Sequence, residues 1–377
     1  MQASGNCEVV IVGDGVAAFA TALALARKGV RNVRVIGAAR ADGKRVGESI
    51  PPDTRTLLQE LGIWDAFLRQ AHQRCLGSCS LWGSEQVGYN DFVLNPHGCG
   101  WHLDRNLFDR LLAEGAIKSG ACWESGKRLI GCEPLHDRGF LLRFRLTDGQ
   151  EEFLAARFVV DATGAGSVFA RHAGSYRLFL DHLVFVYGFF ESPVDSARCS
   201  KPTMLEAVQD GWWYFAGLPE RRVAVAIATD PEIIRSRMLH RRDNWFAYLL
   251  RTKLIAAQLD NCRFLPEELI VRPAPSFRLD RAAGPAWLAV GDAASAYDPI
   301  SSQGIHKALS DALRAADAVA DSVHSDRGTW KEFDHSIRRE FETYTANRNF
   351  LYTQERRWPH SQFWATRHKR MSLRNEN

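Results

Sequence analysis

The chain has 377 residues, of which 46% are hydrophobic and 24% charged, and its formal net charge is +4. This composition is typical of a folded globular protein and excludes a disordered or fibrous chain. The longest strongly apolar run, residues 183–190, is too short to cross a bilayer as a helix.

The N-terminus has no basic region followed by an apolar stretch, so we expect no export signal and a cytoplasmic protein without disulfide bonds. Its 8 cysteines include no Cys-x-x-Cys pair. Cys75 and Cys79 with His72 supply at most three of the four ligands that a zinc site needs. We therefore predict buried thiols and no metal site.

The first predicted unit, residues 8–36, is a strand, a tight turn, a helix and a second strand. Its turn is Gly13-Asp14-Gly15-Val16-Ala17-Ala18. In such a unit Gly13 permits the turn, Gly15 lets backbone amides approach a pyrophosphate, and Ala18 lets the helix pack closely on the strand. The helix N-terminus then meets the phosphate charge with free N–H donors. The segment predicts a dinucleotide-binding fold.

One element of this fingerprint is missing. The second strand normally ends in an acidic residue that binds the ribose hydroxyls, but Gly37 occupies that place. The ribose contact therefore comes from elsewhere or is absent.

Further along the chain, five stretches place glycine turns or charged residues beside apolar strands and helices. The first precedes an amphipathic helix for which Asp53 is the expected N-cap. The second opens a helix, the third and fourth end strands in glycine turns, and the fifth leads into a helix. They are Arg45-Val46-Gly47-Glu48-Ser49-Ile50-Pro51-Pro52, His102-Leu103-Asp104-Arg105, Phe158-Val159-Val160-Asp161-Ala162-Thr163-Gly164, Trp287-Leu288-Ala289-Val290-Gly291-Asp292-Ala293-Ala294 and Asp298-Pro299-Ile300-Ser301-Ser302-Gln303-Gly304.

Taken in this order, the motifs resemble those of the flavin-dependent monooxygenases of the hydroxylase and halogenase superfamily. Three stretches are more narrowly similar to the flavoprotein maturases of tryptophylquinone enzymes: residues 47–51, 100–105 and 211–214. Those relatives act on a tryptophan inside a precursor polypeptide, and they serve lysine oxidase, glycine oxidase and quinohemoprotein amine dehydrogenase.

The resemblance implies an α/β fold with an FAD-binding Rossmann-like domain of the glutathione-reductase type. An antiparallel-sheet substrate domain would be inserted into it, and a helical segment would end the chain. The expected FAD-binding parts are residues 1–80, 101–174 and 281–320. The expected substrate-side insertion is 81–100, the inserted sheet 175–280, and the C-terminal helix with its basic, aromatic tail 321–377.

The resemblance also implies that FAD is bound non-covalently, and it implies which residues contact the cofactor. Arg105 would donate two hydrogen bonds to the pyrophosphate, Asp292 would bind the ribityl chain, and backbone amides near Gln303 would face the pyrimidine edge of the isoalloxazine. The alternatives are a surface ion pair for Arg105 and a helix cap for Asp292. The predicted FAD-contacting residues are Gly13, Gly15, Val16, Ala17, Ala18, Arg45, Glu48, Ser49, Arg105, Thr163, Gly164, Gly291, Asp292, Pro299, Ser302, Gln303, Gly304 and Ile305.

The chemistry implied is reduction of FAD, capture of dioxygen as a flavin C4a-hydroperoxide and oxygen transfer to an electron-rich aromatic ring. We expect residues 175–280 to form an apolar pocket for that ring. His182 is a candidate base, and Trp213, Asp298 and Pro299 complete the candidate catalytic set. A satisfied histidine at a strand end and a core tryptophan are the favoured alternatives for the first two.

Two departures from the family pattern guide the functional hypothesis. Many single-component hydroxylases carry Asp-Gly where this chain has Thr163-Gly164. Electrons would therefore come from a separate flavin reductase rather than directly from NADH or NADPH. Halogenases typically show Trp-x-Trp-x-Ile-Pro, which residues 212–219 do not match. No stretch matches the motif that holds their catalytic lysine, so hydroxylation is preferred.

Four alternatives stay open: a hydroxylase of small aromatics, a halogenase, a non-oxygenating flavin reductase or oxidase, and a flavin-bound scaffold. The expected partners are a precursor polypeptide and a flavin reductase. Apolar residues over 329–351 follow helical spacing, and a basic, aromatic tail follows over 356–370. We expect that tail to be solvated, to cover the pocket mouth or to grip a protein substrate. No other nucleic-acid or membrane-binding module accompanies it, so neither partner is expected.

Overall fold

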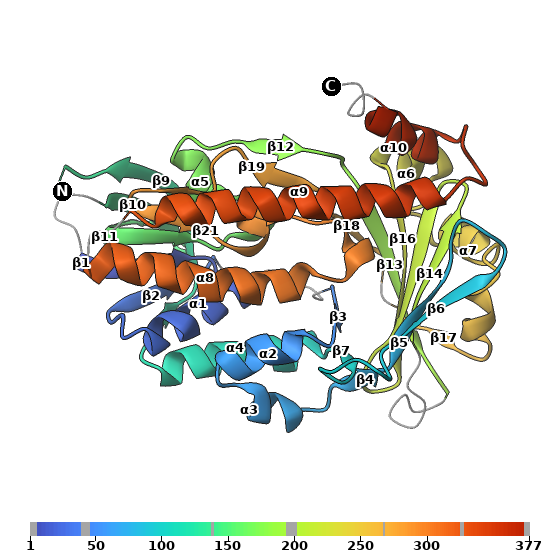
Figure 1. Cartoon of the computed structure of the whole chain (residues 1–377), viewed down its shortest axis with the longest axis horizontal. Coiled ribbons are helices and arrows are strands. Elements are labelled where there is room, and N and C mark those ends of the chain that lie inside the picture. Colours follow the sequence, from blue (N-terminus) through green and yellow to red (C-terminus); the bar gives the residue numbers. More distant parts are fainter. Residues whose placement is uncertain are drawn as a thin grey trace.

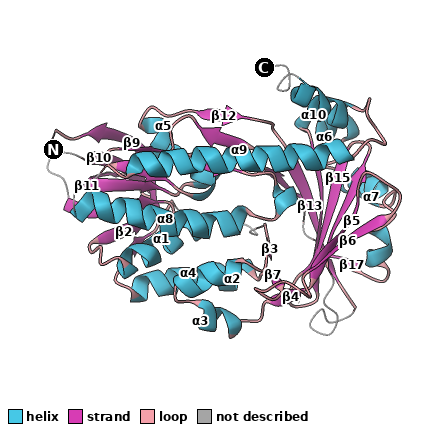
Figure 2. Ribbon diagram, in the orientation of Figure 1, coloured by secondary structure: helices cyan, strands magenta, loops and turns pink. Residues whose placement is uncertain are grey.

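The computed structural model describes residues 6–38, 46–136, 139–193, 202–266, 268–324 and 328–372. Two large sheets lie at opposite ends of the molecule, and the long helix α9 (Trp330–Gln354) runs from one to the other (Figure 1). Figure 2 shows the helices stacked beside the first sheet and the strands of the second sheet fanned out at the other end. No helix within the described ranges is long and apolar enough to span a membrane.

The first sheet has eight strands and a parallel centre. Its order is β20-β21-β11-β1-β2-β8, with β10 and β9 attached in antiparallel fashion beyond β11. Residues 9–12 of β1 are at most 3% exposed, as expected for a parallel strand covered on both faces. The strands are β1 (Asn6–Val12), β2 (Val33–Ile36), β8 (Cys122–Glu124), β9 (Lys127–Pro134), β10 (Phe140–Leu146), β11 (Glu151–Asp161), β20 (Ala283–Gly284) and β21 (Trp287–Ala289).

The turn from β1 into α1 requires a glycine, as the fingerprint predicted. Gly13 has φ +116°, and a Cβ atom there would lie 2.2 Å from the carbonyl oxygen of Ala162 in the turn after β11. The predicted strand, turn, helix and strand over residues 8–36 are confirmed. Helices α1 (Val16–Arg27), α4 (Arg105–Lys118) and α8 (Gly304–His324) pack together beside this sheet, and α2 (Thr54–Glu60), α3 (Trp64–Leu68) and α5 (Val168–His172) complete the unit.

Asp53 precedes α2, but it does not cap that helix. Its backbone is already helical, with φ −65° and ψ −15°, and its side chain makes no cap hydrogen bond. A helical turn begins before Asp53, because the N–H of Thr54 donates to the carbonyl of Pro51 at 3.2 Å. The N-cap prediction is therefore wrong.

The second sheet is antiparallel except where β14 pairs with β5, and its order is β17-β13-β16-β15-β14-β5-β6, with β18 beside β13. Segments from both predicted substrate-side regions, 81–100 and 175–280, contribute strands to it. Helices α6 (Pro231–Arg237) and α7 (Arg242–Leu249) lie near it. The strands are β5 (Gly77–Leu81), β6 (Val87–Asp91), β13 (Val184–Glu191), β14 (Thr203–Val208), β15 (Gly211–Gly217), β16 (Arg222–Thr229), β17 (Arg263–Phe264) and β18 (Ile270–Pro273). The predicted fold class is confirmed.

Two small sheets connect the large ones. Strand β7 (Gly100–His102) pairs with β3 (Ser49–Ile50) and β4 (Gln73–Cys75), which brings the segment after β2 close to the start of α4. The other small sheet is formed by β12 (Arg177–Phe179), β19 (Phe277–Leu279) and β22 (Ser295–Ala296).

The C-terminal segment is part of the core. The predicted helix over 329–351 is confirmed as α9, and α10 (Gln362–Ser372) follows it. Phe363 and Trp364 are fully buried, and the Trp364 indole N–H donates to the carbonyl of Val208 at 2.9 Å. The expectation of a solvated tail is therefore wrong for these residues, because their rings fill space beside the second sheet.

Candidate functional site

A cavity of about 890 Å³ lies between the two large sheets. Its walls come from the α1 turn, the segment before β3, the start of α4, the turns after β11 and β21, the loop before α8, and strands β13, β15 and β18. This volume falls within the range of cofactor sites. Its lining includes Gly15, Val16, Ala17, Glu48, Ser49, Arg105, Gly164, Phe185, Tyr187, Tyr214, Asp292, Pro299, Ser302, Gly304 and Ile305.

Three helix N-termini meet at this cavity. Its lining includes the first residues of α1, α4 and α8, of 12, 14 and 21 residues. At α1 and α8 the N-terminus presents N–H groups and a partial positive charge to the cavity, whereas the Asp104 carboxylate already accepts two N–H groups at the start of α4. Together they suit a ligand with anionic groups at several points, such as the pyrophosphate of FAD and the pyrimidine edge of a reduced flavin. The cavity therefore fits the predicted cofactor.

Most of the predicted FAD-contacting residues line this cavity, and five described ones do not. Ala18 is fully buried in α1, and Gly291 has φ +58° where a Cβ atom would lie 3.0 Å from the Cβ of Ala17. Arg45 lies outside the described residues. The five that are not part of the lining are Gly13, Ala18, Thr163, Gly291 and Gln303.

Thr163 stabilises the turn rather than facing the cavity. Its hydroxyl donates to the carboxylate of Asp161 at 2.6 Å and accepts from the backbone N–H of Val168 at 2.7 Å. The sequence pattern located this turn correctly, but the side chain is occupied by the turn itself.

Arg105 lines the cavity and is held there by the surrounding chain, and its pair with Asp109 is largely buried rather than a surface ion pair. Its Nη1 donates to the carbonyls of Val46 at 2.8 Å and Gly47 at 2.9 Å, while Nη2 lies 3.4 Å from the carboxylate of Asp109. Asp104 caps the same helix by accepting from two backbone N–H groups. The guanidinium thus holds the segment before β3 at the cavity and places a positive charge in its wall.

Asp292 faces the cavity and does not cap a helix. Its side chain is exposed to the cavity and makes no cap hydrogen bond. The surrounding protein raises the pKa of Asp292 by burial, and the nearby positive charge of Lys307 opposes that rise. Lys307 and Asp311 hold this turn through the backbone of Gly291. Lys307 donates to the Gly291 carbonyl at 2.8 Å, and the Asp311 carboxylate accepts from the Gly291 N–H at 2.9 Å. This buried ion pair is not among the sequence predictions, although the i, i+4 spacing of Lys307 and Asp311 on a helix is visible in the sequence.

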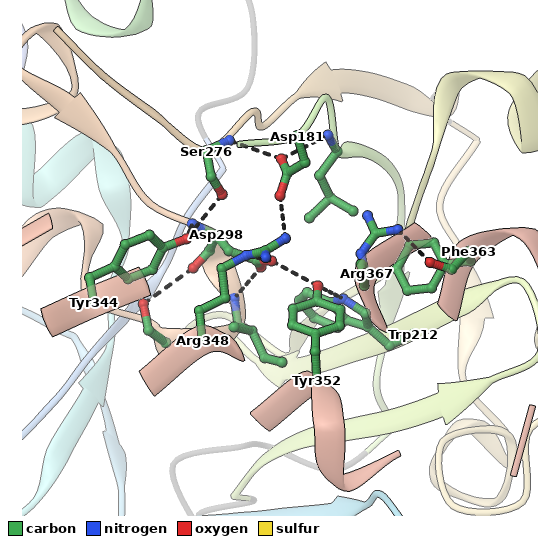
Figure 3. A network of polar contacts seen from close by, with 12 residues as sticks. Asp181, Trp212, Ser276, Asp298, Tyr344, Arg348, Tyr352, Phe363 and Arg367 are labelled. Carbon is green, nitrogen blue, oxygen red and sulfur yellow. Dashed lines mark hydrogen bonds and ion pairs between the residues drawn. The ribbon is translucent and has the colours of Figure 1, made fainter. Parts of the chain in front are cut away.

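Asp298 does not face the cavity, in contrast to its expected catalytic placement. Its fully buried carboxylate accepts from the Arg348 guanidinium at 3.2 Å and from the Tyr352 hydroxyl at 2.7 Å (Figure 3). The Tyr344 hydroxyl accepts from the Asp298 backbone N–H at 2.6 Å. These three partners all come from α9, so Asp298 ties the loop before α8 to that helix.

The same network extends past Arg348 to the second sheet. The Arg348 guanidinium also pairs with Asp181, which lies just before β13 and accepts the backbone N–H of Ser276 at 3.0 Å (Figure 3). Tyr352 accepts from the Trp212 indole N–H at 3.0 Å. One buried set of charges therefore joins α9, the loop before α8 and the second sheet.

The structure does not bring His182 and Trp213 to the cavity either. His182 lines a separate cavity of about 370 Å³ beside Arg348 and stacks on Phe179, with ring centroids 4.9 Å apart. Trp213 is fully buried on the face of β15 turned toward α7, where its ring centroid lies 5.1 Å from that of Trp245. Of the four candidate catalytic residues, Pro299 alone lines the large cavity in the described part of the chain.

The cavity has an aromatic wall formed by Phe185, Tyr187 and Tyr214, which are neighbours in sequence of the residues first considered, His182 and Trp213. Successive side chains of a strand point to opposite faces, so Tyr214 faces the cavity while Trp213 faces away. Phe185 and Tyr187 stack on the same side, with ring centroids 5.4 Å apart. Burial raises the pKa of Tyr187 and of Tyr214 well above the ordinary value, so both are neutral phenols. The sequence shows that neighbouring strand residues point to opposite faces, but it does not show which face of the strand lines the cavity.

Comparisons with known proteins agree with this architecture. The family model described as tryptophan halogenase matches residues 8–93 and 83–376. The chain is 27% identical to LodB of Marinomonas mediterranea, named as an FAD-dependent oxidoreductase, over 98% of both chains. It is 28% identical to the flavin-dependent halogenase gsfI of Penicillium aethiopicum, over 88% of this chain and 67% of that protein.

Solved structures share the fold. The myxobacterial chondrochloren halogenase CndH has a TM-score of 0.87 at 23% identity, over 98% of this chain and 89% of that one. QhpG, described as a peptidyl tryptophan dihydroxylase essential for tryptophylquinone cofactor biogenesis, has a TM-score of 0.76 at 24% identity. That match covers 97% of this chain and 79% of QhpG.

Proposed function

Because the chain belongs to the tryptophan halogenase family of FAD-dependent oxidoreductases, we propose that it hydroxylates a tryptophan side chain of a precursor polypeptide during tryptophylquinone biogenesis. Bound FAD supplies the redox chemistry that activates dioxygen. The residues of the chain bind the cofactor, orient the aromatic ring and exclude water.

One observation carries this proposal. The three stretches similar to the tryptophylquinone maturases, residues 47–51, 100–105 and 211–214, meet at one end of the cavity. Ser49 pairs with His102 between β3 and β7, and the Ser49 and Tyr214 hydroxyls lie 2.9 Å apart. Segments far apart in the chain thus form one wall of the cavity.

The cavity lining favours hydroxylation over halogenation. Halogenases of this superfamily use a catalytic lysine, and no lysine is among the described residues that line the cavity. Lys307, which lies close to it, is held by Asp311 and the carbonyl of Gly291. Phe185, Tyr187 and Tyr214 supply an aromatic surface on which an indole ring can pack.

The polypeptide substrate is supported by QhpG, which is described as a peptidyl tryptophan dihydroxylase and shares the fold of this chain. A small free aromatic is the second candidate. The cavity wall does not exclude it, because the same aromatic surface accepts a free indole or phenol ring.

The test is mass analysis of polypeptides that co-purify with this protein, before and after reduced flavin and ¹⁸O-labelled dioxygen are supplied. We expect labelled oxygen on a tryptophan of the partner. Halogen on a ring when halide is present would instead support a halogenase. An unmodified partner together with a labelled small aromatic would replace the proposed substrate.

A further inference from the structure

Glu48 is a buried carboxylate without a hydrogen-bond partner. It is 3% exposed, and neither carboxylate oxygen accepts a hydrogen bond from the described residues. Its backbone is held in place, because its carbonyl accepts from the N–H of Leu103 at 2.8 Å and Gly47 before it has φ +90°. Burying such a group unpaired is costly, so its presence calls for an explanation beyond stability.

Glu48 stands in the partition between two cavities. One is the large cavity described above, and the other is a chamber of about 70 Å³ that also borders on Arg105. The far side of the chamber is formed by Glu220 and Arg222, where β15 turns into β16. Two nitrogens of Arg222, Nε and Nη2, are buried and have no hydrogen-bond partner among the residues that the structure describes. A polar chamber of this volume is suited to hold water.

Charged and titratable groups surround Glu48 from every neighbouring element. Burial raises the pKa of Glu48, whereas the positive charge of Arg105 opposes that rise. The neutral phenols of Tyr187 and Tyr214 face it from the second sheet. The groups around it are Arg105 and Asp104 at α4, His102 on β7, Tyr187 on β13, Tyr214 on β15, Glu220 after β15 and Arg222 on β16.

We propose that Glu48 is the proton-holding group of the FAD cavity, binding a proton from the chamber when the cofactor is reduced and releasing it when the cofactor is oxidised. Reduction by an external donor of the nicotinamide or reductase class brings two electrons and negative charge into the cavity. That charge disfavours an adjacent carboxylate, so the Glu48 carboxylate becomes a carboxyl by binding a proton from bulk solvent, relayed through water in the chamber. On reoxidation the proton returns to the chamber.

This role predicts a particular dependence of the reduction potential on pH. A group that binds a proton more tightly in the reduced state makes the potential fall more steeply with rising pH, between its pKa values in the two states. Above that window Glu48 is ionised in both states, and its charge lowers the potential. Replacing it with a neutral amide removes both effects.

The experiment is a redox titration of the FAD-loaded protein without aromatic substrate, at a series of pH values, for the unaltered chain, Glu48→Gln and Glu220→Gln. We expect Glu48→Gln to bind about one proton fewer per two electrons within the window and to have a higher potential above it. Glu220→Gln keeps the slope of the unaltered chain, because Glu220 borders the chamber but not the large cavity.

An unchanged slope in Glu48→Gln with FAD bound would overturn the proposal and leave Glu48 a structural role. If Glu48→Gln loses FAD, Glu48→Asp takes its place, because it keeps a titrating carboxyl at a shifted position. The steep part of its curve must then move along the pH axis, and an unmoved curve overturns the proposal. This inference depends only on FAD binding in the proposed function. A wrong substrate therefore leaves the titration unaffected, whereas an unaltered chain that binds no FAD refutes the proposed function itself.

Discussion

At the scale of single residues, Asp298 shows that proximity to a cofactor loop does not by itself indicate chemistry. The residue directly after it, Pro299, lines the cavity, but the Asp298 carboxylate points the other way into the Arg348 network. Glu48 differs from Asp298, because its carboxylate lines the cavity and accepts no hydrogen bond from the described residues. The pattern of neighbours distinguishes the two carboxylates, and their residue type does not.

We predict that Asp298→Asn lowers the free energy of unfolding by about 3 kcal/mol, since it removes one partner of a buried ion pair. Arg348 keeps Asp181 as a second partner, which holds the loss near the low end of the range for such changes. Chemical denaturation monitored by circular dichroism measures the effect. FAD stays bound, because the carboxylate does not line the cavity.

The matched control is Asp317→Asn, which removes a pair with Lys28 whose two side chains are 61% and 47% exposed. A surface pair of this kind changes stability by about 0.5 kcal/mol or less. If Asp298→Asn were as stable as the unaltered chain but lost flavin-dependent turnover, the chemical role first considered for Asp298 would be restored.

At the scale of elements, α9 and α10 link the two large sheets. Tyr344, Arg348 and Tyr352 lie on the face of α9 turned to the Asp298 loop and to β15. On α10, the Arg367 guanidinium pairs with Asp230 at 2.9 Å and lies 3.4 Å from the Phe363 ring centroid. Basic and aromatic residues that were predicted to meet solvent or a partner therefore stabilise the core.

Trp364→Ala is expected to lower the free energy of unfolding by about 3–5 kcal/mol, because it leaves a cavity where a fully buried ring stood. It also removes the hydrogen bond to the carbonyl of Val208. Thermal and chemical denaturation measure the loss. Phe350→Ala on α9, where the ring is 64% exposed, is the control and should change stability by about 0.5 kcal/mol or less.

A different result would restore the first expectation for this segment. If Trp364→Ala kept full stability and instead weakened binding of the polypeptide substrate, the ring would serve docking rather than packing. Binding of the co-purifying polypeptide to both variants distinguishes these outcomes.

At the scale of the whole molecule, the cavity exists only because the two sheets face each other across it. The first sheet supplies helix N-termini for an anionic cofactor, and the second supplies an aromatic wall. Neither unit alone encloses the site. The arrangement suits an enzyme that holds a flavin in one unit and presents a ring from the other.

We predict that NADH or NADPH alone reduces the bound FAD slowly, because the position where single-component hydroxylases carry an aspartate is Thr163, whose side chain is engaged in its own turn. Anaerobic stopped-flow absorbance measures the rate, and dithionite serves as the control that the flavin is reducible. Rapid bleaching by NADPH without a second protein would contradict the need for a separate reductase.

The sequence by itself determined the parts of the site that depend on local backbone requirements. A turn such as the one at Gly13 needs a residue without a side chain, so the glycine fingerprint located the first strand, turn and helix. The order of the flavin motifs likewise predicted the fold class, and most of the FAD-contacting residues predicted from the motifs line the cavity. Local geometry is encoded within a few neighbouring residues, and it can be read without a partner.

Only the tertiary structure decided which way the longer side chains point. Asp298, His182 and Trp213 were predicted to lie near the flavin from their positions in the chain. Instead, Asp298 binds Arg348 on α9, His182 lines the separate cavity beside Arg348, and Trp213 packs against Trp245 on α7. The meeting of Glu48 with the chamber, and of Ser49 with Tyr214, depends on contacts between segments more than a hundred residues apart. Such contacts follow from the global arrangement of the two sheets, because no local pattern specifies the partner across a cavity.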